Sequence, residues 1–125
     1  MTLRPLTSGE TLCTPGRTIG EDNINLFTGL VGDFTPVHTD EVFASTTPHG
    51  GRIAHGSLTM ATAIGLFTQM NMLGERVIAL LNLNWNFSSV VKIGDTVRSR
   101  VSGLRSSPCR SARLAPQSGI SRWKW

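Results

Sequence analysis

The chain has 125 residues, of which 39% are hydrophobic and 16% are charged, and its formal net charge is +4. This length is enough for one domain with a buried core, and the composition argues against a disordered chain or a coiled coil. No apolar run approaches the roughly 18 residues that cross a membrane, and the N-terminus lacks a signal-peptide core, so we predict no membrane partner. The two cysteines, Cys13 and Cys109, make no disulfide framework or zinc set, which favours a cytoplasmic location.

The positive charge is confined to the end of the chain. Residues 102–125 hold five basic side chains and no acidic one, whereas residues 1–101 hold seven basic and eight acidic side chains. No RNA-binding signature, zinc-finger spacing or basic helix accompanies this charge, so we predict that nucleic acid is not a partner. The apolar residues beyond Val101 are scattered, and this pattern predicts a poorly ordered end rather than two more strands.

The N-terminal part of the chain predicts a strand and then a helix. Residues 9–19 contain Pro15 and Gly16 and are typical of an edge strand or an extended arm. Thr18 followed by Glu21 is a capping-box pattern, which predicts the start of a helix. We expect this helix to end at Gly32 and to bury a face formed by Ile24, Phe27 and Leu30.

Two loops and a short helix are expected next. Residues 33–38 contain Pro36 and predict a loop, and Thr39 starts a second short helix with Val42 and Phe43 facing inward. Residues 46–52 predict another loop, because they contain Pro48, Gly50 and Gly51.

The longest predicted helix covers residues 57–72 and is apolar almost all round. Such a helix has to be enclosed by other structure, and a wide sheet is the usual means. After Gly74 the apolar period changes to two: in residues 81–87, leucine, tryptophan and phenylalanine alternate with asparagine, which predicts a strand. A turn at Gly94 and Asp95 precedes a second predicted strand that ends at Val101.

Two polar residues around Pro36 are candidates for proton transfer. Asp33 and His38 are five positions apart, and a loop stiffened by proline can turn both side chains toward one point. A carboxylate with an imidazole can hold a water molecule and pass a proton at neutral pH. The alternative, that Asp33 caps a local turn and His38 is a surface residue, stays open from the spacing alone.

A second candidate lies where the long helix should begin, at His55, Gly56 and Ser57. Backbone N–H groups in the first turn of a helix are free, and glycine lets a ligand approach the backbone closely. The Gly56 N–H is therefore a candidate donor to a carbonyl or thioester oxygen, although a plain helix start with His55 in the cap fits equally well. The histidines show no metal-ligand spacing, so we predict that no metal is bound.

The residues around both candidates resemble a known family. Gly32–Asp40 (GDFTPVHTD), Phe43–Ala44 and Gly51–Gly56 (GRIAHG) are similar to the MaoC-like dehydratases, or (R)-specific enoyl-CoA hydratases. The resemblance covers roughly residues 8–104 and implies an α+β hotdog fold, in which a curved antiparallel sheet wraps a long central helix. It implies a truncated domain over residues 1–104, a sheet that is incomplete at the C-terminus, and a basic tail over residues 105–125. Members of the family continue with two long strands there, so we expect the tail not to be native family sequence.

The resemblance also implies a reaction: the addition of water to trans-2-enoyl-CoA thioesters to give (R)-3-hydroxyacyl-CoA, or its reverse, by a homodimer without a cofactor. In this reaction Asp33 and His38 would activate water, and the Gly56 N–H would bind the enolate oxygen. The residues implied in substrate binding are Thr35, Ala54 and His55. Many members have asparagine in place of Thr35, and a serine on the central helix is replaced here by Ile64. A hotdog acyl-CoA thioesterase and a non-catalytic acyl-CoA-binding or partner subunit remain as alternatives.

Overall fold

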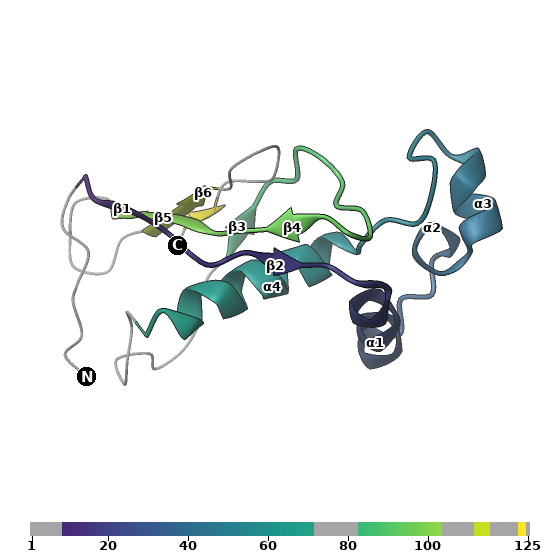
Figure 1. The fold of residues 1–125 in the computed structure, drawn as a ribbon, viewed down its shortest axis with the longest axis horizontal. Helices are drawn as coiled ribbons and strands as arrows, with labels where there is room; N and C mark the ends of the chain where they lie inside the picture. The colour runs from purple at the N-terminus through teal and green to yellow at the C-terminus, as the bar shows by residue number, and fades with distance from the viewer. Residues whose placement is uncertain (1–8, 72–82, 104–111, 116–122, 125) are drawn as a thin grey trace. The chain divides into compact units, whose positions relative to one another are not determined.

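A computed structural model of the chain describes residues 9–71, 83–103, 112–115 and 123–124 (Figure 1). They belong to two compact units. The first unit comprises Gly16–Thr62 and Val90–Val97, and the second comprises the described residues of Met1–Pro15, Ala63–Ser89 and Arg98–Trp125. Among the described helices, none has the length and apolar content needed to cross a membrane.

The first unit holds most of the helices and one small sheet. Its elements are β2 (Arg17–Thr18), α1 (Glu21–Val31), α2 (Pro36–Thr39), α3 (Glu41–Thr46), the start of α4 (Gly56–Gln69) and β4 (Thr96–Val97). Strands β2 and β4 pair antiparallel. The Ile19 N–H donates to the Asp95 carbonyl at 2.9 Å, and the Gly94 N–H donates to the Ile19 carbonyl at 2.8 Å, which extends this pairing into the predicted turn.

Helix α1 ends where the sequence predicts but begins differently. Gly32 closes it in the left-handed conformation, with φ 75° and its N–H donating to the Thr28 carbonyl. The prediction of a Thr18 cap is wrong: the N-cap is Gly20, whose N–H donates to the Asn23 side chain at 2.9 Å. Thr18 instead belongs to β2, where its hydroxyl meets that of Thr96 at 2.8 Å, because strand pairing keeps its backbone extended.

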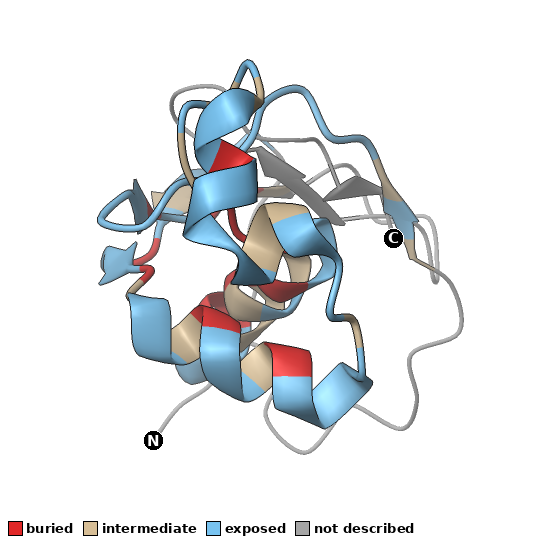
Figure 2. Ribbon diagram, turned by 90° about the vertical axis from the view of Figure 1, so that its right-hand side faces the viewer, coloured by how far each residue is buried: buried red, intermediate tan, exposed pale blue. Residues whose placement is uncertain are grey.

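The inward faces of α1 and α3 also differ from the prediction. Leu30 is 82% exposed and Val42 is 81% exposed, and Phe43 is exposed as well, whereas Ala44 is fully buried. Part of the predicted loop over 33–38 is helical, because Pro36 occupies the first position of α2. Figure 2 illustrates the outcome: its helices carry isolated buried segments, and much of their remaining surface is exposed.

A short extended segment leads into α4 and is tied to a second chain segment. Ile53 forms an isolated antiparallel bridge with Lys92, and the Ala54 N–H donates to the Val91 carbonyl at 2.7 Å. Helix α4 starts at Gly56, one residue before the predicted start. Its buried side chains are Leu58, Thr59, Ala63, Leu66 and Phe67.

The second unit contains the remaining strands. Strand β5 (Arg100–Gly103) pairs antiparallel with both β1 (Thr11–Cys13) and β6 (Ala112–Ala115), as Figure 1 shows. Strand β3 (Asn84–Trp85) pairs with β7 (Trp123–Lys124). The prediction that no strand follows Val101 is wrong for β6 and β7, because pairing with β5 and β3 supplies backbone partners that scattered apolar residues do not reveal. Residues 81–82, at the start of the predicted strand, lie outside the described residues.

Candidate active site

Asp33 lies in the turn that follows α1, and its carboxylate is held by Thr35. The Thr35 hydroxyl donates to Asp33 Oδ1 at 2.5 Å, and the Thr35 N–H donates to the same oxygen at 3.2 Å. These two hydrogen bonds favour the charged form and lower the pKa of Asp33 below its ordinary value, although partial desolvation opposes them. Asp33 is therefore a carboxylate at neutral pH, and its Oδ2 is not engaged by Thr35.

His38 projects from α2, and its ring is anchored to the segment before α4. His38 Nδ1 lies 2.8 Å from the Ile53 carbonyl oxygen. Because a carbonyl oxygen can only accept a hydrogen bond, we assign the ring proton to Nδ1, which donates it. The Ile53 N–H donates in return to the Val37 carbonyl at 3.2 Å. With Nδ1 donating, the other nitrogen, Nε2, carries a lone pair and can accept a proton.

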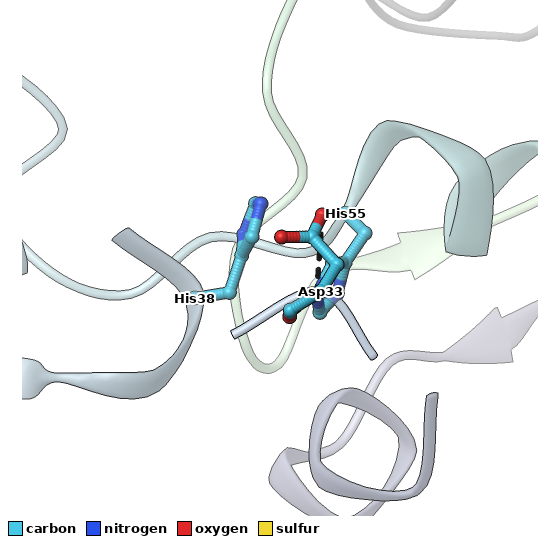
Figure 3. Close-up of side chains that lie close together, drawn as sticks. All are labelled: Asp33, His38 and His55. Atoms are coloured by element: carbon cyan, nitrogen blue, oxygen red, sulfur yellow. Dashed lines mark hydrogen bonds and ion pairs between the residues drawn. The ribbon is translucent and has the colours of Figure 1, made fainter. Parts of the chain in front are cut away.

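His55 completes the cluster and lies next to Asp33 (Figure 3). Its side chain is 1% exposed, and its Nε2 lies 3.1 Å from the Asp33 carbonyl oxygen and 4.0 Å from Asp33 Oδ2. Its ring stacks on that of His38, with centroids 3.9 Å apart and planes at 28°. The three side chains offer ligand-type atoms that all lie within 4.8 Å of one another.

The arrangement of these three residues suits proton transfer better than metal binding. An imidazole binds a metal through a lone pair in its ring plane, and two nearly parallel stacked rings cannot both direct lone pairs at one ion. In addition, His55 Nε2 faces a carbonyl oxygen. The prediction that no metal is bound stays a prediction.

Gly56 is the first residue of α4 and is exposed, directly after His55. Among the described residues, none accepts a hydrogen bond from the Gly56 N–H, as expected for the first turn of a helix. Its amide can therefore donate to an oxygen of a bound molecule.

An arginine clamp supports the segment that carries these groups. Arg52 is largely buried, and its guanidinium binds Glu21 of α1 and, at 2.9 Å, Glu41 of α3. Hydrogen bonds to Glu21 and then to Glu41 raise the pKa of Arg52, and the bond from Arg52 lowers the pKa of Glu41. The clamp joins α1 and α3 next to Ile53, the residue that anchors His38.

The structure brings together Asp33, His38 and His55 and places Gly56 next to them along the chain. Thr35 touches the Asp33 carboxylate, whereas Ala54 is buried and its N–H is bonded to Val91. Sequence reasoning missed two contributors, Arg52 and the Thr28 hydroxyl, which lies 3.4 Å from His55 Nε2. The position of Thr28, four residues after the buried Ile24, was the available signal for an inward-facing side chain.

Comparison with known proteins identifies the family. A model of the MaoC like domain matches residues 5–112. The (R)-specific enoyl-CoA hydratase of Rhodospirillum rubrum is 40% identical over 85 residues, which cover 68% of this chain and 58% of that protein. Protein MaoC of Klebsiella aerogenes is 35% identical over 121 residues, which cover 94% of this chain and 36% of that protein.

A third relative, the 3-hydroxybutyryl-CoA dehydratase of Methylorubrum extorquens, is 36% identical over 102 residues, 78% of this chain and 61% of that protein. The chain thus spans between 36% and 61% of the length of these three curated relatives.

Solved structures agree with the sequence relatives. A monoamine oxidase regulatory protein from Archaeoglobus fulgidus has a TM-score of 0.79 at 26% identity, over 99% of this chain and 95% of that one. The R-hydratase PhaJ1 of Pseudomonas aeruginosa has a TM-score of 0.71 at 27% identity, over 95% and 79%. The expected α+β hotdog fold is confirmed by this similarity. On the match over residues 5–112, the chain belongs to the MaoC-like domain family.

Proposed function

We propose that this chain adds water to the double bond of trans-2-enoyl-CoA thioesters to give (R)-3-hydroxyacyl-CoA, or catalyses the reverse dehydration. The observation that supports it best is the pair of acceptors in the Asp33–His38 turn. Asp33 Oδ2 and His38 Nε2 are both left available when Thr35 and Ile53 hold the other atoms of these groups. A water molecule has two protons to donate and can be oriented by both acceptors.

The reaction balances with these groups alone. The water oxygen bonds to C3 while its proton passes to an acceptor. The π electron pair of the C2=C3 double bond then forms a double bond between C1 and C2, and negative charge develops on the thioester oxygen. The Gly56 N–H stabilises the resulting enolate, and the proton taken from water is returned to C2 on the same face. Because the pKa of Asp33 is lowered, its carboxylate holds a proton poorly, which favours His38 Nε2 as the carrier and Asp33 as the orienting group.

The geometry of the site supports an indirect role for the remaining residues. Thr35 acts on the substrate indirectly, by holding the Asp33 carboxylate. Ala54 is 6% exposed and His55 is 1% exposed, so their contribution to substrate binding is to support the residues at the surface. No cofactor is required, because the reaction only moves one water molecule and one proton.

The active form is a homodimer in the cytoplasm. Six large apolar side chains of α1, α3 and the turn after α1 are exposed in the single chain, which leaves apolar surface that a second copy can cover. They are Leu26, Leu30, Val31, Phe34, Val42 and Phe43. Light scattering at micromolar concentration should give twice the chain mass, and a stable monomer with full activity would reject this assignment.

The test of the reaction is the loss of enoyl-thioester absorbance from crotonyl-CoA. We expect the wild-type chain to consume it and Asp33→Asn to be slower by about 10²–10⁴-fold. Asp40→Asn is the matched control: Asp40 caps α3 by accepting the Phe43 N–H, and asparagine keeps that acceptor. Thiol trapping in the same sample separates the alternatives, because a thioesterase releases free CoA and a hydratase does not. An inactive, folded wild-type chain would favour the binding or partner-subunit alternative.

A further inference from the structure

His55 is a buried polar side chain placed against both groups of the proposed acid–base pair. Besides Asp33 and His38, its ring contacts Phe27, with centroids 5.3 Å apart and planes at 57°, and the Thr28 hydroxyl. Four side chains from α1, the following turn and α2 thus surround one imidazole. The imidazole itself does not reach the surface, since it is 1% exposed.

The first function of this ring is to hold the backbone of Asp33. His55 Nε2 lies 3.1 Å from the Asp33 carbonyl oxygen, and an oxygen acceptor requires the proton to be on Nε2. Asp33 lies outside α1, just beyond its C-cap, so no helical hydrogen bond fixes its peptide group. The contact with His55 therefore restrains the peptide from which the carboxylate projects.

The second function is to hold the plane of the His38 ring. The hydrogen bond from His38 Nδ1 to the Ile53 carbonyl sets the direction of one ring edge, but the ring can still rotate about that bond. Stacking on His55 at 3.9 Å and 28° removes this rotation. Together the two contacts determine where the lone pair of His38 Nε2 points.

Neither helix capping nor packing alone accounts for a histidine at position 55. The His55 carbonyl accepts the Thr59 N–H, but its side chain makes no capping bond to the described part of α4. Its Nδ1 is buried and receives no hydrogen bond from any described residue. A buried acceptor without a donor is unfavourable, so an apolar side chain would fill this space better if packing were the only role.

We propose that His55 is a positioning residue of the reaction, which sets the spacing of Asp33 and His38 through its Nε2–H and its ring face. The expected loss of turnover rests on the proposed hydration, whereas the positioning of Asp33 and His38 does not. A misplacement of about 1 Å in a reacting group lowers rates by up to about 100-fold, so His55 affects turnover without touching the substrate.

Two substitutions separate the two contacts. His55→Gln keeps an N–H donor for the Asp33 carbonyl but has no ring to stack on His38. His55→Phe keeps a ring but has no donor. We expect each to lower kcat by about 10–100-fold with KM changed less than about twofold, because the reacting groups move while the substrate's contacts remain. His49→Gln is the matched control, since His49 lies in the loop after α3 and makes no contact with this cluster among the described side chains.

Nitrogen-detected NMR of the histidine rings tests the geometry without reference to activity. In the wild-type chain we expect the proton on Nδ1 of His38 and on Nε2 of His55. Stacking should shield the ring protons of His38, and this shielding should disappear in His55→Gln and persist in His55→Phe. Because the tautomers are measured in the wild type, the test holds even if a variant does not fold.

Each possible result supports or overturns the inference. Wild-type kcat in both folded variants, a raised KM with unchanged kcat, or a proton on Nδ1 of His55 would each overturn it. If the wild-type chain is inactive on crotonyl-CoA, the proposed reaction fails. The NMR measurement then still decides whether His55 sets the positions of its two neighbours.

Discussion

Each of the two compact units of this protein is stabilised internally by a different kind of contact. In Gly16–Thr62 with Val90–Val97, side-chain interactions hold the site: the Thr35 hydroxyl binds the Asp33 carboxylate, His38 binds the Ile53 carbonyl, and Arg52 joins two helices through their glutamates. In the other unit the described contacts are mainly backbone pairs between strands. The chemistry-bearing side chains lie in the first kind of structure, where each is directed by a specific partner.

This difference predicts that substitutions of the site residues in the first unit change activity more than stability. Substitutions in the second unit, or of a supporting residue such as Arg52, should change stability more than activity. Four substitutions test the contrast, from the largest expected effect to the smallest.

His38→Asn should have the largest effect. The asparagine amide can still donate to the Ile53 carbonyl as Nδ1 does, but the lone pair of Nε2 is lost. We expect kcat to fall by about 10²–10⁴-fold while the melting temperature stays close to that of the wild type. A variant that keeps most of its turnover would remove His38 from the proton-transfer step.

Thr14→Val tests the strand unit. Thr14 is buried, and its hydroxyl accepts the Ser99 N–H at 2.9 Å, so valine leaves a buried donor unpaired. We expect a loss of about 1–3 kcal/mol in the free energy of unfolding, measured by urea titration, with kcat unchanged. Thr11→Val, at an exposed position of β1, is the control. A loss of kcat without a loss of stability would contradict the contrast between the units.

Thr35→Val should lower kcat, because the Asp33 carboxylate loses the hydrogen bond that orients it, and it should also change the pH dependence of stability. Without the Thr35 hydroxyl, the pKa of Asp33 rises toward its ordinary value, because the largest cause of its lowered pKa is lost. Since the lowered pKa stabilises the folded state above the ordinary pKa of aspartate, the variant is less stable at neutral pH. The difference shrinks as the pH falls through the lowered pKa. Urea titrations of both chains at neutral and acidic pH measure this difference, and a difference that does not change with pH would contradict the effect of Thr35 on the pKa of Asp33.

Arg52→Gln should have the smallest effect. It removes the ion pairs with Glu21 and Glu41, whose side chains are both more than half exposed, so solvent and salt already weaken them. We expect the melting temperature to fall by a few degrees at low salt and by less at high salt. Arg17→Gln, at an exposed position of β2, is the control and should leave the melting temperature unchanged at both salt concentrations.

Turns and helix ends were predicted correctly where residues a few positions apart determine them. Gly32 ends α1, since glycine adopts the left-handed conformation without strain. The Pro36 turn brings Asp33 and His38 together over five positions, and α4 begins next to His55 as expected. The roles of these residues in catalysis stay predictions.

Other features depended on distant partners and could not be read from the sequence. Val42 and Phe43 were predicted to face inward, but no described element covers them in the single chain, so they are exposed. Thr18 has the chemistry of a helix cap, yet its partner is Thr96, 78 positions away. Strands β6 and β7 are defined by their pairing with β5 and β3, not by an apolar period of their own.

The sequence by itself thus determined the family, the end of α1 and the pair of residues at the Pro36 turn, because turns and caps depend on residues a few positions apart. Only the tertiary structure decided that His55 is buried, that its ring stacks on His38, and that Arg52 joins α1 to α3. Such contacts join residues 11 to 31 positions apart, and they form only when long-range packing brings their backbones together.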